Sequence, residues 1–344
     1  MNSDHAAAAR PLERTRRQRL APALTLVLLS PFIAEVLSGA TRLSFIFAFV
    51  PEILVWGVGT LIIRELALRW RTGWTGILLM GLGLSIAEEF VIQQTSIAPL
   101  PWLGSAVAYG RVFGVNWVYF LYMLGYESVW VVLVPILLTL LLFPERCEEP
   151  WLRPRGFFLL GALFLMGSFM AWFAWTQRAR PLVFHVAKYQ PPLITILSGI
   201  IAIALLFAVA GRLRQDGERG GSSPPAPQPW VVLLSVLVLG LPWNLLLVLV
   251  FVPSYSLPLW IPMLAGCIWA FLAYLLIRYW GSLPGWKEMH RWAVVFAATL
   301  ECMAGGFLGS SAWPRMDIVA KLVLNAAMLV WLLWLAQKVR HRMA

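Results

Sequence analysis

The sequence predicts an all-α fold, a polytopic transmembrane helix bundle of about 10 spans with both termini cytoplasmic. Hydrophobic residues make up 60% of the 344 residues and charged residues only 12%, about half the charged share of a typical soluble domain. Apolar runs of about twenty residues, the length that crosses a bilayer, recur along the whole chain. Basic residues gather at alternate ends of these runs, as the positive-inside rule requires.

The apolar runs are interpreted as helices because backbone polar groups in lipid must bond within their own segment. The first run follows a basic cytoplasmic tail, residues 1–20, and resembles the apolar part of a signal peptide. Its length and Glu35 favour an uncleaved first helix. The predicted spans are 21–37, 43–63, 74–93, 115–143, 157–176, 192–210, 230–252, 257–278, 291–310 and 318–336.

The basic residues also orient the bundle. With this set of spans, 20 of the 27 Lys and Arg residues fall on the side of the two termini, which is therefore predicted to be cytoplasmic. The protein is expected to be a multi-pass protein of the cell (inner) membrane, with the lipid bilayer as its partner. The net charge of +11 is spread over the span ends and forms no single face or tail, so no nucleic-acid partner is predicted.

One stretch divides the chain into parts. Residues 211–229, within GRLRQDGERGGSSPPAPQPW, combine Gly, Ser and Pro and predict a flexible cytoplasmic linker. It separates a six-helix membrane domain with a Glu-Glu motif, residues 21–210, from a four-helix membrane domain, residues 230–344. In the third span, Gly81/Ser85 and Gly83/Ala87 form small-xxx-small pairs, which predict close packing on a neighbouring helix.

Acidic residues fall inside the predicted spans with no Lys or Arg well inside a span to pair with them. An ionised side chain at mid-bilayer costs about 2.5–3.5 kcal/mol on insertion scales, so these acids should face the bundle interior or a wet cavity. The alternating direction of the helices places all but Glu301 in the outer half of the first four helices. The acids are Glu35, Glu52, Glu88, Glu89, Glu127 and Glu301.

A polar pocket near the outer leaflet is therefore predicted. Its candidate catalytic residues are Glu88, Glu89 and Glu127. Adjacent residues on a helix diverge by about 100°, so one of Glu88 and Glu89 can face the pocket while the other bonds a neighbour. The alternative interpretation is that the acids bond backbone or hydroxyl groups near a wet interface. The other candidates for the pocket are Glu52, Gln93, Glu301 and His185, the last from an outer loop.

The stretch AEEFVIQ, Ala87 to Gln93, resembles the first motif of the CPBP (Abi, or CAAX-protease and bacteriocin-processing) intramembrane proteases. That motif is Glu-Glu-x-x-x-Arg, and later helices of the family carry Phe-x-x-x-His and a second His or Asn motif. The stretch YESVWVVLVPILLTLLLFP, Tyr126 to Pro144, looks like a segment of bacterial proteins loosely grouped there. The likeness covers about residues 64–144 and implies a helical membrane protease in which glutamate and histidine activate water.

Two positions depart from the pattern of that family. Gln93 stands where the motif has Arg, and Glu127 stands where the family has His. The histidines fall in predicted tails or loops, so Ser85 lacks an intramembrane base and is predicted to be a packing residue. The cysteines are too scattered for a disulfide framework or a zinc site, and no nucleotide-binding or HExxH motif occurs. No metal and no cofactor is predicted.

Three functions stay open. The first is a non-catalytic, scaffold-like relative of the CPBP proteins that binds a partner membrane protein. The second is an active glutamate-dependent intramembrane hydrolase that cleaves a peptide substrate, with Glu88 or Glu89 acting together with Glu127. The third is a proton- or cation-coupled transporter that uses the glutamates of the outer half.

Overall fold

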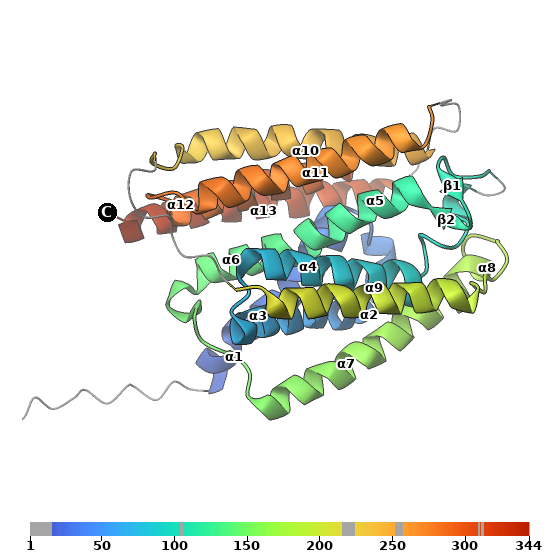
Figure 1. Cartoon of the computed structure of the whole chain (residues 1–344), viewed down its shortest axis with the longest axis horizontal. Coiled ribbons are helices and arrows are strands. Elements are labelled where there is room, and N and C mark those ends of the chain that lie inside the picture. Colours follow the sequence, from blue (N-terminus) through green and yellow to red (C-terminus); the bar gives the residue numbers. More distant parts are fainter. Residues whose placement is uncertain are drawn as a thin grey trace, which may run out of the picture.

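The computed structural model describes residues 16–103, 106–214, 224–251, 257–308, 310 and 313–343, which form one bundle of helices (Figure 1). Within these residues nine helical segments are long and apolar enough to cross a membrane, which confirms the predicted all-α, polytopic fold. Residues 1–15 of the predicted basic tail and residues 215–223 of the predicted linker lie outside the described residues.

The first four crossing segments each join several helical pieces without a loop between them. Their α-helices are α1 (Arg16–Pro31), α2 (Phe49–Glu52), α3 (Val58–Trp70), α4 (Gly73–Ile86), α5 (Trp117–Tyr126) and α6 (Val134–Leu142). Their π-helical pieces are η1 (Phe32–Leu37), η3 (Ile53–Gly57), η4 (Ala87–Ile92) and η6 (Glu127–Leu133). Short 3₁₀ turns are η2 (Leu43–Ala48), η5 (Pro101–Leu103) and η7 (Pro144–Arg146).

The rest of the chain forms longer helices and one small hairpin. The helices are α7 (Pro154–Trp172), the π-helical η8 (Phe173–Ala179), α8 (Arg180–Leu182), α9 (Leu193–Arg212), α10 (Pro229–Phe251), α11 (Trp260–Gly281), α12 (Glu288–Gly305) and α13 (Arg315–Met343). The hairpin pairs β1 (Arg111–Val112) with β2 (Val115–Asn116) in antiparallel register. It occupies the start of the predicted span 115–143, so that helix begins at Trp117 instead.

Proline explains most of the π-helical pieces. Pro31 directly precedes η1, Pro51 lies just before η3, and Pro135 follows η6. Proline has no N–H and its ring clashes with the carbonyl one turn earlier, and membrane helices accommodate it through local 3₁₀ or π adjustments. The remaining π-helix of the first four crossing segments, η4, has no proline beside it and contains the Glu-Glu pair.

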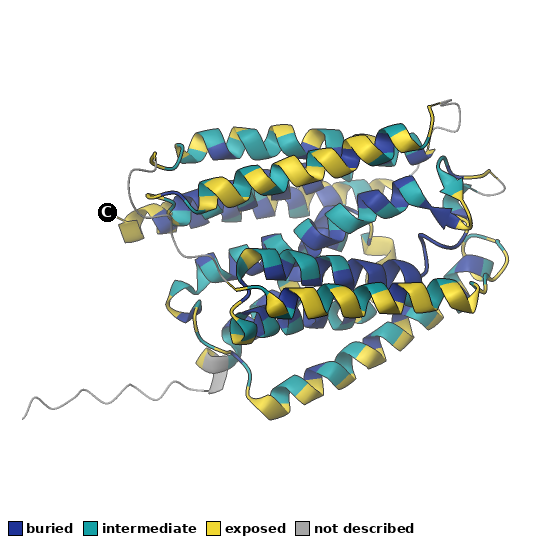
Figure 2. Ribbon diagram, in the orientation of Figure 1, coloured by how far each residue is buried: buried dark blue, intermediate teal, exposed yellow. Residues whose placement is uncertain are grey.

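Helix α12 corresponds to the predicted span 291–310 but is not among the nine apolar crossing segments. Glu288, Arg291 and Glu301 make it too polar for a lipid-facing helix. It is instead buried among its neighbours, packed against α10, α6 and α13. In contrast, the outer faces of α7, α9 and α11 are largely exposed and apolar (Figure 2), as a lipid-facing surface requires.

Two hydrophobic cores divide the interior. The first core joins α5, α10, α12 and α13, and the second core joins α1, α3, α4 and α7. The segments that contain η1 and η6 contribute to both, since Ile33 and Trp130 belong to the first core while Ala34 and Val131 belong to the second. The first core thus draws on both predicted membrane domains, whose division at the linker stays a prediction.

The predicted close packing of the third span is confirmed. A Cβ at Gly81 would lie 3.3 Å from the Cα of Ser128 on η6, and a Cβ at Gly83 would lie 2.7 Å from the ring of Phe207 on α9. The absence of side chains at these two positions lets α4 approach both neighbours. The close contact of α4 with η6 brings the Glu-Glu pair, which directly follows α4, near the segment that carries Glu127.

The bundle has two ends, which we name by their contents. The hairpin end holds β1, β2, the loop of residues 93–100 and the end of η1, and the C-terminal end holds η7 and the last residues of α13 (Figure 1). At the C-terminal end α3 continues to Trp70, beyond the predicted end at residue 63. The buried pair Arg64–Glu65 therefore lies on the helix, with 2.6 Å between Nη1 and Oε1.

Candidate functional site

The membrane glutamates lie where helices are wound irregularly. Glu35 is in η1, Glu88 and Glu89 are in η4, and Glu127 begins η6. Glu52 is the residue directly before η3. Single π-helical turns are rare and are frequently found at functional sites. We call Glu35, Glu52, Glu88, Glu89 and Glu127 the glutamate cluster.

Glu89 is the best-bonded acid of the cluster. Its Oε2 accepts hydrogen bonds from the hydroxyls of Thr95, at 2.8 Å, and Ser96, at 2.6 Å. Both donors belong to the loop that follows η4 and folds back over it, and both are buried. This arrangement fits the expectation that one of the two adjacent glutamates bonds a neighbour.

Glu88, the neighbour of Glu89 in η4, has a different environment. It is 2% exposed, and neither of its carboxylate oxygens has a hydrogen-bond partner among the described residues. An ionised carboxylate in this position would be costly, because burial removes its water without replacing the lost hydrogen bonds. Glu88 is therefore the acid most in need of a proton, a cation or a water molecule.

Glu52 and Glu127 are each half satisfied. The hydroxyl of Thr41 donates to Oε1 of Glu52, whereas Oε2 has no partner within the described residues. Oε2 of Glu127 is likewise unpartnered, although Ser85 lies against this carboxyl group. Ser85 is fully buried and also donates to the carbonyl of Met123 at 3.2 Å, as a packing residue would.

The acids of the cluster are close enough to affect one another electrostatically. Glu88 interacts with Glu35, Glu52 and Glu89, and Glu127 interacts with Glu35, Glu88 and Glu89. The structure thus brings together the three candidate catalytic residues with Glu35 and Glu52. Neighbouring carboxylates in a low-dielectric interior repel one another, so ionising all of them together has a high free-energy cost.

Glu301, the other buried acid of the predicted pocket, lies in a separate place. Its carboxylate packs against Gly240 of α10, within the first core, and its Oε1 has no partner among the described residues. The residue that follows it, Cys302, donates to the carbonyl of Ile33 at 3.3 Å. Glu301 is therefore next to the segment that carries Glu35 but is not part of the glutamate cluster.

Two predicted pocket residues do not join the cluster through their side chains. Gln93 is half-buried and ends η4, where its backbone N–H donates to the carbonyl of Glu88 at 2.9 Å. His185 is exposed in the loop between α8 and α9, with a left-handed backbone at φ 54°. Neither side chain has a recorded contact with a glutamate in the part of the chain that the structure describes.

A buried lysine near the cluster was not expected from the sequence. Lys321 of α13 is 3% exposed, and its ammonium donates to the carbonyl of Leu37 at the end of η1. The ammonium also lies 4.7 Å from the centre of the Phe307 ring. The sequence assigns Lys321 to the outer side, and its depth follows from α13 beginning at Arg315, before the predicted start.

The hairpin end covers the cluster with a bonded loop. Asn116 donates through Nδ2 to the carbonyls of Thr95, at 3.0 Å, and Ala98, at 2.7 Å. Arg111 donates to the carbonyls of Ile97 and Ala98, each at 3.1 Å. The loop that bonds Glu89 is thus fixed from outside by two side chains of the hairpin.

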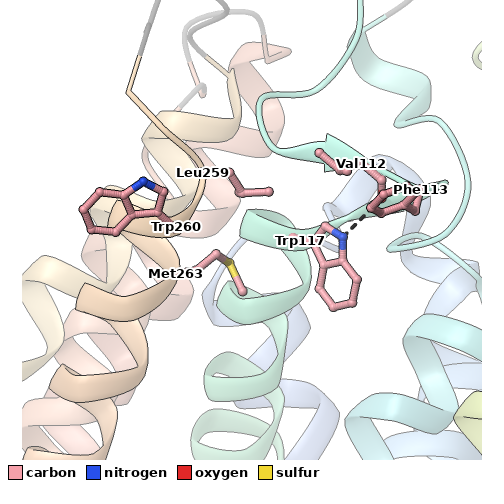
Figure 3. A pocket seen from close by; sticks show the side chains of 6 residues that line it. All are labelled: Val112, Phe113, Trp117, Leu259, Trp260 and Met263. Atoms are coloured by element: carbon pink, nitrogen blue, oxygen red, sulfur yellow. Dashed lines mark hydrogen bonds between the residues drawn. The ribbon is translucent and has the colours of Figure 1, made fainter.

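An open hollow of about 590 Å³ lies elsewhere at this end (Figure 3). It separates the hairpin from the start of α11, and its walls are apolar and aromatic. The lining residues are Val112, Phe113, Trp117, Leu259, Trp260 and Met263. None of these lining residues belongs to the glutamate cluster.

The chemistry of the cluster is set by carboxylates that interact with one another. Among the described residues no group of three His, Cys, Asp or Glu side chains is placed to hold a metal ion. Several carboxylate oxygens of the cluster have no hydrogen-bond partner among the described residues, which leaves them open to a proton or a cation. Reversible proton or monovalent cation binding is the simplest chemistry that these side chains support.

Comparison with known proteins gives a family but no function. The model of a family described as "Uncharacterized membrane protein family" matches residues 24–342, which include the whole glutamate cluster. No curated protein and no solved structure matches the chain. The match supports a multi-pass membrane protein, while the CPBP resemblance stays a prediction. The chain therefore belongs to this family of membrane proteins.

Proposed function

We propose that the protein is a proton- or cation-coupled transporter of the cell (inner) membrane in which the glutamate cluster binds the coupling ion. The observation that carries this proposal is the burial of Glu88 with both carboxylate oxygens unpartnered among the described residues. A glutamine there would avoid the cost of a buried charge. An acid in such a place is best explained by an exchangeable proton or a bound cation.

The glutamate cluster lies between the two hydrophobic cores, which supports a coupling of ion binding to the relative arrangement of these cores. Glu35 and Glu127 lie on the segments that pack into both cores. Many transporters work by rigid-body rocking of two helix groups around a fixed site between them. In the proposed cycle, proton binding removes charge from the seam between the cores and so changes their preferred arrangement.

The first test is infrared spectroscopy of the purified protein in lipid, titrated from low to high pH. The absorption of protonated carboxyl groups should include a component that is lost in the Glu88→Gln variant. Glu145→Gln is the matched control, because Glu145 is an exposed acid at the C-terminal end. An unchanged carboxyl absorption in Glu88→Gln would remove the basis of the proposal.

The second test asks whether access to the cluster alternates. A single cysteine at Ser85, in a protein without its native cysteines, should react with impermeant reagents from either side, depending on the pH imposed across the membrane. Labelling from one side only, at every pH, would contradict transport. It would favour the non-catalytic, scaffold-like function, which also predicts a copurifying membrane protein and tolerance of single glutamate substitutions.

A second candidate function is a glutamate-dependent intramembrane hydrolase. It is favoured by the resemblance of Ala87 to Gln93 to the CPBP motif and by the electrostatic contact of Glu88 with Glu127. In this mechanism Glu88 accepts a proton from a water molecule that attacks a peptide bond. Cleavage of a membrane peptide that is lost in both Glu88→Gln and Glu127→Gln, with folding retained, would replace the transporter proposal.

A further inference from the structure

The C-terminal end of the bundle contains a second hollow, of about 340 Å³, with a different character. It lies where α12 begins and α13 ends. Three cationic side chains and one carboxylate contribute to its walls, so its formal charge is positive. The lining residues are Trp286, Lys287, Glu288, Arg291, Arg342 and Met343.

The hollow is held in shape by contacts that leave two cations free to bind a ligand. Arg342 donates to the carbonyl of Leu141 at 2.9 Å and lies 3.2 Å from Oε2 of Glu288. Lys287 and Arg291 form no ion pair within the described residues. Glu288 is the one acid among the lining residues, and its Oε2 makes no hydrogen bond within the described residues. A single carboxylate thus faces three cationic side chains, which leaves the hollow with an excess of positive charge.

The start of α12 adds to this positive field. The helix begins at Glu288, and the backbone N–H of Lys287 donates to Nδ1 of His290 at 3.0 Å. Helix N-termini attract anions through their free N–H groups and dipole. Trp286 stacks on the ring of His290, with 4.9 Å between ring centres. Tryptophan is enriched at the depth of lipid headgroups.

We propose that this hollow binds the phosphate of an anionic phospholipid, with Lys287, Arg291 and Arg342 as its cationic partners. Basic pockets between membrane helices on the cytoplasmic side bind anionic headgroups, and the basic residues of the sequence predict that this end is cytoplasmic. Met343 and the lipid-facing helices supply the apolar surface for the acyl chains. The site uses none of the glutamate cluster and is independent of the proposed function.

The test compares two double variants of the full chain in neutral detergent. Lys287→Gln with Arg291→Gln removes the free cations of the hollow. Arg153→Gln with Arg155→Gln is the matched control, because these exposed cations lie at the same end but outside the hollow. Native mass spectrometry measures bound phosphatidylglycerol and phosphatidylcholine, and thermal unfolding measures the stabilisation by each lipid.

The wild-type chain and the control should bind phosphatidylglycerol in preference to phosphatidylcholine. In the hollow variant the affinity for phosphatidylglycerol should fall about fivefold for each removed charge. If the double variant does not fold, the single variant Lys287→Gln replaces it, because Lys287 is exposed. Its affinity for phosphatidylglycerol should fall about fivefold. An equal loss of phosphatidylglycerol affinity in the hollow variant and in the control would overturn the proposed site. If inorganic phosphate stabilises the wild type as much as phosphatidylglycerol does, the ligand is a soluble phosphate and not a lipid.

Discussion

Gly240 of α10 and Glu301 of α12 lie so close that a Cβ at residue 240 would collide with the carboxylate of Glu301. The two helices are in contact along much of their length. A glycine at this position is therefore required by packing, although it lies inside a helix where alanine would ordinarily be more stable. The pair fixes where the buried acid of α12 can lie.

Gly240→Ala is expected to destabilise the protein by about 1–3 kcal/mol, the usual cost of adding a methyl group to a packed site. The measurement is the unfolding midpoint in detergent. Gly161→Ala is the matched control, because no heavy atom lies within 4 Å of a Cβ at that position in α7. The packing argument fails if the two substitutions have the same effect.

Glu65→Gln is expected to destabilise the protein by about 3–5 kcal/mol, because it leaves the buried guanidinium of Arg64 without its charge partner. Oε1 of Glu65 also accepts the backbone N–H of Trp151 at 2.9 Å. Thermal unfolding is the measurement. The control Glu145→Gln changes an exposed acid and should stay within about 0.5 kcal/mol of the wild type. A small effect at residue 65 would show that the pair is not a structural requirement.

Asn116→Asp is expected to loosen the loop that covers the glutamate cluster. The substitution keeps the oxygen that accepts from Arg111 at 2.8 Å but removes the Nδ2 donor to Thr95 and Ala98. The carbonyl of Ala98 still accepts from Arg111, but that of Thr95 loses its donor, and leaving a buried carbonyl unpaired costs about 1–3 kcal/mol. Hydrogen exchange of residues 93–100 should become faster while that of α7 does not change. Exchange that is equal in the two proteins would mean that Asn116 does not hold the loop.

Burial raises the pKa of the Cys147 thiol, which lies in the loop at the C-terminal end. Below that pKa only a small fraction is thiolate, so alkylation at neutral pH should be slower than for a free thiol. The rate should rise about tenfold per pH unit until the pKa is passed. A chain with Cys267→Ala and Cys302→Ser isolates this thiol for the measurement.

The same chain tests orientation. An impermeant maleimide should modify Cys147 from the cytoplasmic side only, as the positive-inside pattern predicts. Modification from the outside would reverse the predicted topology and would move the basic hollow to the outer leaflet.

Much of the fold could be predicted because apolar length is a strong signal in a membrane chain. The acids of the cluster were found by the same reasoning, since an unpaired carboxylate in an apolar run is conspicuous. The π-helical pieces could not be predicted, because one extra residue in a single turn barely changes the spacing of apolar residues along the sequence. Pro31, Pro51 and Pro135, which lie in the same apolar runs as Glu35, Glu52 and Glu127, are the available signal.

The partners of the acids were harder to predict than the acids. Thr95 and Ser96 reach Glu89 only because their loop folds back, and that path depends on Asn116, which is distant in sequence. Long-range packing decides such contacts, and a single sequence does not encode it in a local pattern.

The polar character of α12 has a consequence for how the protein is made. Glu301, buried within α12, reduces what this helix gains from insertion into lipid. Entry into the bilayer together with neighbours that shield this acid avoids the cost. Because α10 and α6 precede it in the chain and pack against it, they are available as it leaves the ribosome. The last assembly step of the bundle is then the closing of α13 over a helix that its predecessors already shelter.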